Sequence, residues 1–298
     1  MRLLITGGSG LLGSKIASIS IDRCYLTYAG YNQHPDISDT SIKLDITDRA
    51  SVRHVFNQVD PDVVVHAAAL TNVDLCERDR ELAKKVNING TENVVKYCLA
   101  HEAFLVYVST DYVFSGERGM YKENDDTSPV NFYGESKLEG EEIVQREPID
   151  SCIVRPSVIY GSTPAAGKTN FVLWVIENLR SNTSIKIVDD QWVSPTLNTN
   201  LAAMILEIVE RKLDGIYHLA GATPINRYEF THLIADHFEL DKNLITTAKS
   251  SEMNWAARRP RNSTLNVEKA MRQLRVKPIE VDDALKQLKT EMNMEGFR

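Results

Sequence analysis

MRLLITGGSGLLG, residues 1–13, is the stretch that decides the fold of this 298-residue chain. An apolar run with strand character leads directly into Gly7, Gly10 and Gly13, which are separated by two residues each, and a helix-like segment follows. Glycines at such a turn let the backbone approach a pyrophosphate, and the free N–H groups at the helix start attract its negative charge. A glycine-rich turn without a ligand is the alternative, but the strand-to-helix context favours a dinucleotide site.

The rest of the first half alternates short apolar runs with helix-like stretches. Val63, Val64 and Val65 form an unbroken β-branched run, which is typical of a strand buried on both faces. We therefore predict an α/β fold: a Rossmann-type doubly wound parallel sheet with a smaller, non-contiguous C-terminal substrate domain. Strands are predicted at residues 2–6, 25–30, 62–67, 103–109 and 151–155, and helices are predicted from Gly10, Asp48, Arg80 and Asn131.

The domain organisation is predicted from the point, after residue 155, where the regular alternation of apolar runs and helix-like stretches ends. Residues 1–155 are predicted to form the dinucleotide-binding domain, and residues 156–298 mainly the substrate-binding domain. Residues 201–211 are apolar at helical spacing, and residues 215–220 have the character of another strand. Such a late strand is explained if the chain crosses back to the sheet, so segments near residues 185–221 are assigned to the first domain.

The bulk composition excludes several classes of function. A formal net charge of -7 argues against binding to nucleic acid, which would need a basic face. No apolar run approaches the roughly 20 residues that span a bilayer, and the first strand leads into the glycine loop without room for a signal sequence. We therefore predict a cytoplasmic protein that acts on a small molecule.

Cysteine and histidine spacing gives no metal or disulfide signal. The four cysteines, at positions 24, 76, 98 and 152, are widely scattered and are predicted to be free buried thiols. The seven histidines form no closely spaced group with Cys or acidic residues, so no metal site is predicted.

Tyr133 and Lys137 form a second informative pair. On a helix from Asn131, their spacing of four places both side chains on one face, where the ammonium can stabilise the phenolate left when the phenol gives up its proton. Thr110 follows a predicted strand. Its hydroxyl could hold the carbonyl oxygen of a substrate to which the Tyr133 phenol gives its proton. These three residues predict a carbonyl-reductase site; the alternatives are a surface Tyr with an unrelated Lys and a structural strand-end hydroxyl.

Ten blocks that cover nearly the whole chain resemble the dTDP-4-dehydrorhamnose reductases, a branch of the extended short-chain dehydrogenase/reductase superfamily. The blocks are TGGSGLLG at Thr6, LDITD at Leu44, HAAALTNVD at His66, VNINGTENV at Val86, VSTDYVF at Val108, PVNFYGESKLEGE at Pro129, IVRPSVIYG at Ile153, DDQWVSPT at Asp189, GIYHLAG at Gly215 and RPRNSTLN at Arg259. The resemblance implies that Tyr133 is the general acid, that Lys137 lowers its pKa and binds the nicotinamide ribose, and that Thr110 orients the carbonyl.

The resemblance also implies the cofactor contacts. Asp45 would accept a hydrogen bond from the adenine amino group or act as a turn residue, whereas Asp48 would cap the next helix. The second strand ends at Tyr31 and Asn32, where no carboxylate excludes a 2'-phosphate; this favours NADPH, and NADH stays open because no Arg is present there. The predicted cofactor-binding residues are Gly7, Ser9, Gly10, Leu11, Leu12, Gly13, Tyr31, Asn32, Asp45, Ile46, Ala67, Ala68, Ala69, Tyr133 and Lys137.

The substrate side rests on fewer signals. Arg258, Arg259 and Arg261 form a basic cluster that suits a diphosphate, although a solvated basic turn has the same composition. Tyr112 stands where related dehydratases carry Glu, which favours reduction over dehydration. Val158 departs from the Trp that bacterial members often place against the sugar, so the sugar is left open. The predicted substrate-binding residues are Thr110, Asp111, Gln191, Arg259 and Arg261.

The resulting hypothesis is an NAD(P)H-dependent oxidoreductase that reduces the 4-keto group of a nucleotide-diphosphate deoxysugar, with dTDP-4-dehydrorhamnose to dTDP-rhamnose as the first choice. Two alternatives stay open. The chain also resembles the β subunit of methionine adenosyltransferase, which binds a cofactor and a partner enzyme, and nucleotide-sugar epimerases share the superfamily. The sequence leaves open whether the chain forms a homodimer.

Overall fold

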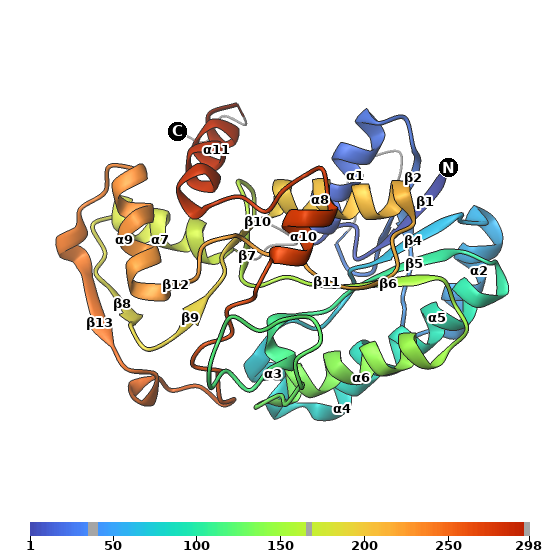
Figure 1. Cartoon of the computed structure of the whole chain (residues 1–298), viewed down its shortest axis with the longest axis horizontal. Helices are drawn as coiled ribbons and strands as arrows, with labels where there is room; N and C mark the ends of the chain where they lie inside the picture. The colour runs from blue at the N-terminus through green and yellow to red at the C-terminus, as the bar shows by residue number, and fades with distance from the viewer. Residues whose placement is uncertain (35–40, 165–168, 295–298) are drawn as a thin grey trace.

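A seven-stranded sheet in which every neighbouring pair is parallel forms the centre of one lobe in the computed structural model (Figure 1). The structure describes residues 1–34, 41–164 and 169–294. In spatial order the strands are β11 (Gly215–His218), β6 (Ser151–Arg155), β5 (Phe104–Val108), β4 (Val63–His66), β1 (Arg2–Thr6), β2 (Leu26–Tyr31) and β3 (Ser41–Lys43). The order reverses between β1 and β4, so the predicted doubly wound parallel sheet is confirmed.

Helices cover both faces of this sheet (Figure 1). α1 (Gly13–Asp22) and α8 (Asn198–Arg211) pack on one face, and α2 (Arg49–Val59), α5 (Gly90–Ala100) and α6 (Phe132–Arg146) on the other. β4 shows why an unbroken valine run is needed: Val63 and Val65 belong to the core beneath α1 and α8, whereas Val64 belongs to the core on the opposite face.

Local signals set the helix starts. The side chain of Asp48 accepts a hydrogen bond from the Ala50 amide and caps α2, and Asn131 caps α6 through the Gly134 amide. The first helix begins at Gly13 rather than Gly10, because the glycine turn occupies the residues between. The helix predicted from Arg80 is divided into α4 (Arg80–Ala83), a π-helical segment η1 (Lys84–Asn89) and α5, and α3 (Val73–Arg78) precedes it.

The second lobe has its own hydrophobic core and lies beside the sheet (Figure 1). It contains α7 (Phe171–Arg180), α9 (Arg227–His237), α11 (Val281–Met294) and the parallel pair β8 (Ile185–Val188) and β13 (Ile245–Ala248). Two further pairs connect the lobes: β7 (Ile159–Tyr160) with β10 (Thr196–Leu197), and β9 (Trp192–Val193) with β12 (Ile225–Asn226).

The segment near residues 185–221 divides between the lobes. α8 and β11 return to the sheet, and β11 pairs with β6. β8 does not return, because Ile185 and Ile187 are buried in the core of the second lobe, where β8 pairs with β13. The expected crossing back therefore starts after β8.

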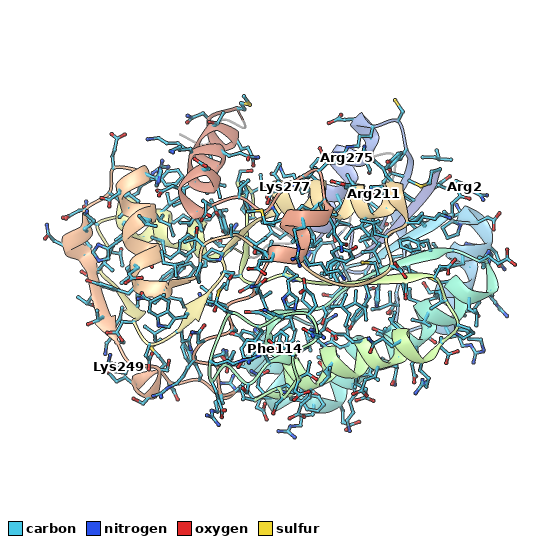
Figure 2. The ribbon with its side chains drawn as sticks, viewed as in Figure 1. Arg2, Phe114, Arg211, Lys249, Arg275 and Lys277 are labelled. Carbon is cyan, nitrogen blue, oxygen red and sulfur yellow. The ribbon has the colours of Figure 1, made fainter. Side chains whose placement is uncertain are left out.

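A buried carboxylate ties the C-terminal part of the chain to α8. Glu207 accepts hydrogen bonds from the Arg211 guanidinium at 2.6 Å and from the backbone amides of Arg275 and Val276 at 2.8 Å each. Figure 2 shows Arg211 and Arg275 beside α8 and α10 (Glu268–Gln273). These contacts hold the turn after α10 against the helix that covers the sheet.

Three of the four cysteines are buried thiols, as predicted, but Cys24 is exposed. Cys24 lies in the turn between α1 and β2 with φ +60°, outside both cores. The described His, Cys, Asp and Glu side chains form no group of three or more that could hold a metal ion. Every helix in the described ranges is too short or too polar to cross a lipid bilayer.

Candidate active site

A cavity of about 730 Å³ opens at the carboxyl ends of the parallel strands, beside the point where strand order reverses. It extends from the glycine loop to the first residues of the second lobe. The predicted site residues that line it are Gly7, Ser9, Gly10, Leu11, Leu12, Gly13, Asn32, Asp45, Ile46, Ala67, Ala68, Ala69, Thr110, Asp111, Tyr133 and Lys137. The predicted residues that do not line it are Tyr31, Gln191, Arg259 and Arg261.

The glycine loop packs so closely that side chains are excluded at Gly7, Gly8 and Gly13. Gly7 has φ +70°, and a Cβ there would lie 2.8 Å from Cα of Ala68. A Cβ at Gly13 would lie 2.2 Å from the Gly7 carbonyl oxygen. The loop therefore brings bare backbone and the N-terminus of α1 to the cavity wall, an arrangement that fits a dinucleotide pyrophosphate.

A cation that the sequence did not reveal, Lys43, lies beside the lining residue Asn32 at the opposite end of the cofactor region. β2 and β3 pair so that Tyr31 is opposite Lys43, and Lys43 Nζ donates to the backbone carbonyl of Asn32 and to Asn32 Oδ1, the latter at 3.2 Å. Asn32 and Asp45 line the cavity nearby. Asp45 accepts hydrogen bonds from the amide and hydroxyl of Thr47, so its carboxylate also holds the turn after β3.

The reacting residues come from two adjacent elements. Tyr133 and Lys137 lie one turn apart on α6. Thr110 follows β5; its hydroxyl accepts from the Tyr112 amide at 3.2 Å and donates to Asp111 Oδ1 at 3.0 Å. The Tyr112 ring meets the Tyr133 ring edge to face, with centroids 5.8 Å apart. All five side chains line the same cavity.

Burial dominates the electrostatics of the reacting pair. Burial lowers the pKa of Lys137 to about 7, and the negative charge of Glu141 opposes that shift. Burial raises the pKa of Tyr133, and the hydrogen bond with Thr110 opposes it. The net direction for Tyr133 is opposite to the predicted lowering by Lys137. The Lys137 ammonium instead lies over the Tyr107 ring, 4.1 Å from its centroid.

An ion pair in the protein interior adjoins Lys137. Glu141 lies one turn further along α6, and Arg155 donates to both of its carboxylate oxygens, from Nε at 2.9 Å and from Nη2 at 2.6 Å. Ser109, directly before Thr110, donates to the same carboxylate at 2.5 Å. Arg155 Nη1 also lies 3.5 Å from Nε2 of His218 on β11. β6, the end of β5 and α6 therefore meet at one carboxylate, and β11 approaches it through Arg155.

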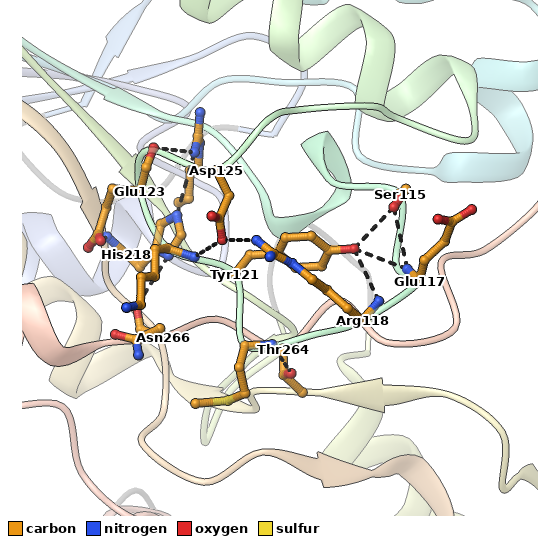
Figure 3. A network of polar contacts seen from close by, with 12 residues as sticks. Ser115, Glu117, Arg118, Tyr121, Glu123, Asp125, His218, Thr264 and Asn266 are labelled. Atoms are coloured by element: carbon orange, nitrogen blue, oxygen red, sulfur yellow. Dashed lines mark hydrogen bonds and ion pairs between the residues drawn. The ribbon is translucent and has the colours of Figure 1, made fainter.

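The loop between Thr110 and α6 is anchored by a further polar network (Figure 3). The Tyr121 hydroxyl accepts hydrogen bonds from the backbone amides of Glu117 and Arg118. The His218 amide donates to Glu123 at 3.1 Å, and the Met120 amide donates to the Thr264 hydroxyl at 2.7 Å. These contacts connect the loop to β11 and to the C-terminal segment, and so fix the entrance to α6.

The predicted substrate residues have different surroundings. Asp111 is buried and accepts hydrogen bonds from the hydroxyls of Ser157 and Ser263, at 2.8 and 2.6 Å, which join three segments of the chain. Arg259 forms an ion pair with Asp74 at 2.9 Å. Arg261 is exposed. Their contact with substrate stays a prediction.

Three residues that line the cavity from the second lobe carry no signal in the sequence that would assign them to the substrate: Asn170, Phe171 and Arg227. All three belong to the start of α7 or α9, and their sequence neighbourhoods carry no active-site spacing. The contact that holds Arg227 joins segments that are distant in the sequence: Arg227 Nε donates to Gln191 Oε1 at 3.2 Å. Val158, where the resemblance departs, also lines the cavity and has φ +39°, an uncommon conformation for a β-branched residue.

Comparison with known proteins matches the chain along nearly its whole length. Residues 1–294 match the model of a family described as RmlD substrate binding domain. A probable low-salt glycan biosynthesis reductase, Agl14, of Haloferax volcanii is 32% identical over 90% of this chain and 90% of its own. Methionine adenosyltransferase 2 subunit beta of Xenopus tropicalis is 31% identical over 90% of this chain and 81% of its own.

Among solved structures, dTDP-4-dehydrorhamnose reductase from Bacillus anthracis in complex with NADP is similar, with a TM-score of 0.88 and 30% sequence identity. The superposition covers 97% of this chain and 99% of that one. The similarity therefore includes both the sheet and the second lobe.

Proposed function

Because the chain belongs to the RmlD substrate binding domain family, we propose that it catalyses NADPH-dependent reduction of the 4-keto group of a nucleotide-diphosphate deoxysugar. The first-choice reaction converts dTDP-4-dehydrorhamnose to dTDP-rhamnose. The observation that carries the proposal is that Thr110, Tyr133 and Lys137 line one cavity together with the glycine loop. The similar Bacillus anthracis reductase, crystallised with NADP, supports the choice of cofactor.

The protein's own residues supply the proton and hold the carbonyl. A bound reduced nicotinamide would supply the hydride. The raised pKa of Tyr133 keeps its phenol protonated near neutral pH, so that it can donate a proton to the carbonyl oxygen. The Thr110 hydroxyl, which donates to Asp111 Oδ1 in the free protein, would turn to donate its one hydrogen to the same oxygen, and the Lys137 ammonium stabilises the phenolate that remains.

The side chains around this centre favour reduction over elimination of water. Elimination needs an additional acid and base next to the sugar, and Tyr112 occupies the position where related dehydratases carry Glu. Its phenol has a pKa that burial raises, so it is a poor base near neutral pH.

We also propose that residues 1–155 hold the cofactor and that residues 156–298 supply most of the sugar-binding surface. The distribution of the lining residues supports this division. The glycine loop, Asp45 and Lys137 come from the first segment, whereas Val158, Phe171 and Arg227 come from the second.

The decisive experiment measures oxidation of NADPH with dTDP-4-dehydrorhamnose and identifies the sugar product. We expect stoichiometric formation of dTDP-rhamnose, loss of turnover in Tyr133→Phe, and NADPH binding that this variant retains. Full turnover in Tyr133→Phe would exclude the assigned mechanism. Sugar interconversion without net NADPH oxidation would indicate an epimerase instead.

A second candidate function is a regulatory subunit, which the similarity to methionine adenosyltransferase 2 subunit beta favours. In that case the chain would bind a methionine adenosyltransferase and change its kinetics. The two functions separate cleanly, because a regulatory effect would survive Tyr133→Phe while sugar reduction would not.

A further inference from the structure

Two cationic side chains line the described part of the cavity, Lys137 and Arg227. Lys137 belongs to the reacting centre on α6, and it lies almost completely buried. Arg227 is the first residue of α9 and enters the cavity from the second lobe. Since Arg stays protonated in proteins, Arg227 is a permanent positive charge at the substrate end of the cavity.

The guanidinium of Arg227 is held in place by neighbouring groups. Its Nε donates to Gln191 Oε1 at 3.2 Å, and its backbone amide donates to the Gln191 carbonyl at 3.0 Å. The face of the Phe171 ring supports it, with the guanidinium carbon 5.1 Å from the ring centroid. The side chain is therefore oriented before any ligand arrives.

Arg227 lacks the counterion that the other arginines near the site possess. Arg155 pairs with Glu141 and Arg259 with Asp74, whereas no carboxylate within the described ranges forms an ion pair with Arg227. The neighbouring Gln191 also has an unpaired polar atom. The residue is 3% exposed, and its buried Nε2 has no hydrogen-bond partner among the described groups. The guanidinium of Arg227, which lines the cavity, therefore keeps N–H donors available for an anion with several acceptor oxygens.

Tyr112 interacts both with Arg227 and with the reacting Tyr133. Arg227 approaches Tyr112, whose ring in turn meets the Tyr133 ring at 5.8 Å between centroids. In a nucleotide-diphosphate 4-ketosugar, the keto group and the diphosphate are attached at opposite ends of the pyranose ring. With the keto oxygen at Tyr133, the diphosphate would extend past Tyr112 toward Arg227.

We propose that Arg227 binds the diphosphate of the nucleotide-sugar substrate and that Gln191 is a positioning residue that holds its guanidinium. The inference rests on the proposed reductase function. It transfers the role of diphosphate ligand from Arg259 and Arg261 to a residue on the second lobe. Arg259 then serves to hold the C-terminal segment against α3 through Asp74.

Binding of dTDP tests the inference without any need for turnover. Calorimetric titration of the NADP-saturated protein with dTDP and with thymidine isolates the contribution of the diphosphate. We expect Arg227→Gln to weaken dTDP binding roughly 10- to 100-fold, the loss expected for charge-assisted hydrogen bonds, and to leave thymidine binding unchanged. Arg227→Lys should recover part of the affinity, because it keeps the charge but loses the fork of donors.

Steady-state kinetics and matched variants complete the test. We expect Arg227→Gln to raise KM for the sugar nucleotide and to leave KM for NADPH unchanged, and Gln191→Leu to raise KM less. Arg261→Gln, on the exposed segment, should leave dTDP affinity unchanged. Unaltered dTDP affinity in Arg227→Gln, or the full loss in Arg259→Gln or Arg261→Gln, would overturn the inference. If dTDP binding depends on Arg227 but no sugar is reduced, the proposed function fails and the diphosphate site stands.

Discussion

Glu141 receives hydrogen bonds from both Nε and Nη2 of Arg155, at 2.9 and 2.6 Å, one helical turn beyond Lys137. Both side chains of the pair are almost completely buried. The third contact, from Ser109, ties the carboxylate to the strand end that carries Thr110. The pair therefore holds α6 against β6, the Ser109 contact holds α6 against the end of β5, and Glu141 provides the negative charge that acts on Lys137.

Replacing that charge should alter the pH dependence of catalysis. Burial lowers the pKa of Lys137, and Glu141 opposes this shift. The other titratable groups around the cluster are Arg155, His218, Tyr107, Tyr133 and His66. In Glu141→Gln the ammonium loses its favourable partner while Arg155 keeps its charge, so the pKa of Lys137 falls further. Activity that needs the ammonium is lost as pH rises through this pKa. We expect the alkaline limb of kcat/KM to move to lower pH.

Two controls separate this effect from instability. Glu139→Gln changes an exposed carboxylate on the same helix and should leave the pH profile unchanged. Glu141→Gln leaves Arg155 buried without its partner, at a cost of about 3–5 kcal/mol, which Glu141→Gln/Arg155→Gln should reduce. An unchanged alkaline limb in a folded Glu141→Gln protein would mean that the pair is purely structural.

Thr110 should contribute to the chemical step through its hydroxyl. Thr110→Ser keeps that hydroxyl and is expected to retain kcat within a few-fold, whereas Thr110→Val should lower kcat roughly 100-fold with KM for NADPH unchanged. The measurement is steady-state turnover combined with thermal unfolding, because valine also removes the contact with the Tyr112 amide. Wild-type turnover in Thr110→Val would limit this residue to that structural contact.

Lys43 should determine the preference for NADPH. It is exposed beside Asn32, at the end of β2 where the ribose 2'-phosphate would lie. We expect Lys43→Gln to raise KM for NADPH about ten-fold, the effect of one charge-assisted contact, with KM for NADH unchanged. Lys84→Gln, which removes an exposed lysine on η1, is the control. Parallel changes for both cofactors in Lys43→Gln would contradict a specific phosphate contact.

Glu207 should link stability to pH. Burial raises the pKa of this carboxyl, but the amides of Val276 and Arg275 and the Arg211 guanidinium outweigh burial, so the net pKa is lowered. A carboxyl with a lowered folded-state pKa stabilises the protein above its unfolded-state pKa, and this contribution is lost as pH falls through the folded-state pKa. We expect Glu207→Gln to reduce the free energy of unfolding by about 1–3 kcal/mol near neutral pH.

Urea unfolding at neutral pH and at a pH below the ordinary carboxyl pKa of about 4.3 checks this expectation. The difference between wild type and Glu207→Gln should shrink in acid. Glu142→Gln, at an exposed position on α6, should match the wild type at both values of pH.

The elements that depend on a local residue pattern could be predicted from the sequence alone. The glycine turn, the valine run of β4 and the caps at Asp48 and Asn131 each express short-range rules, so the strands and the doubly wound sheet could be predicted from them. The reacting residues were accessible for the same reason, since Tyr133 and Lys137 are one helical turn apart.

The remaining features depend on contacts between distant segments. Lys43 reaches Asn32 only because β3 pairs with β2, and Arg227 reaches the cavity only because α9 starts beside Gln191. The direction of the Tyr133 pKa depends on how deeply the phenol is buried, which no spacing of residues encodes. Composition also could not show that Arg259, one residue of the basic cluster, forms an ion pair with Asp74.

The return of β11 to the sheet also determines when the sheet can be completed while the chain is being translated. β6 ends at Arg155, and its neighbour β11 begins at Gly215. The chain between them includes α7, β8 and α8, which are translated first. At a translation rate of about 5–20 residues per second, the outer edge of β6 waits roughly 3–12 s for its partner. An open strand edge is a template for pairing with other chains, so the yield of native protein should depend on chaperones that shield the nascent chain during this interval.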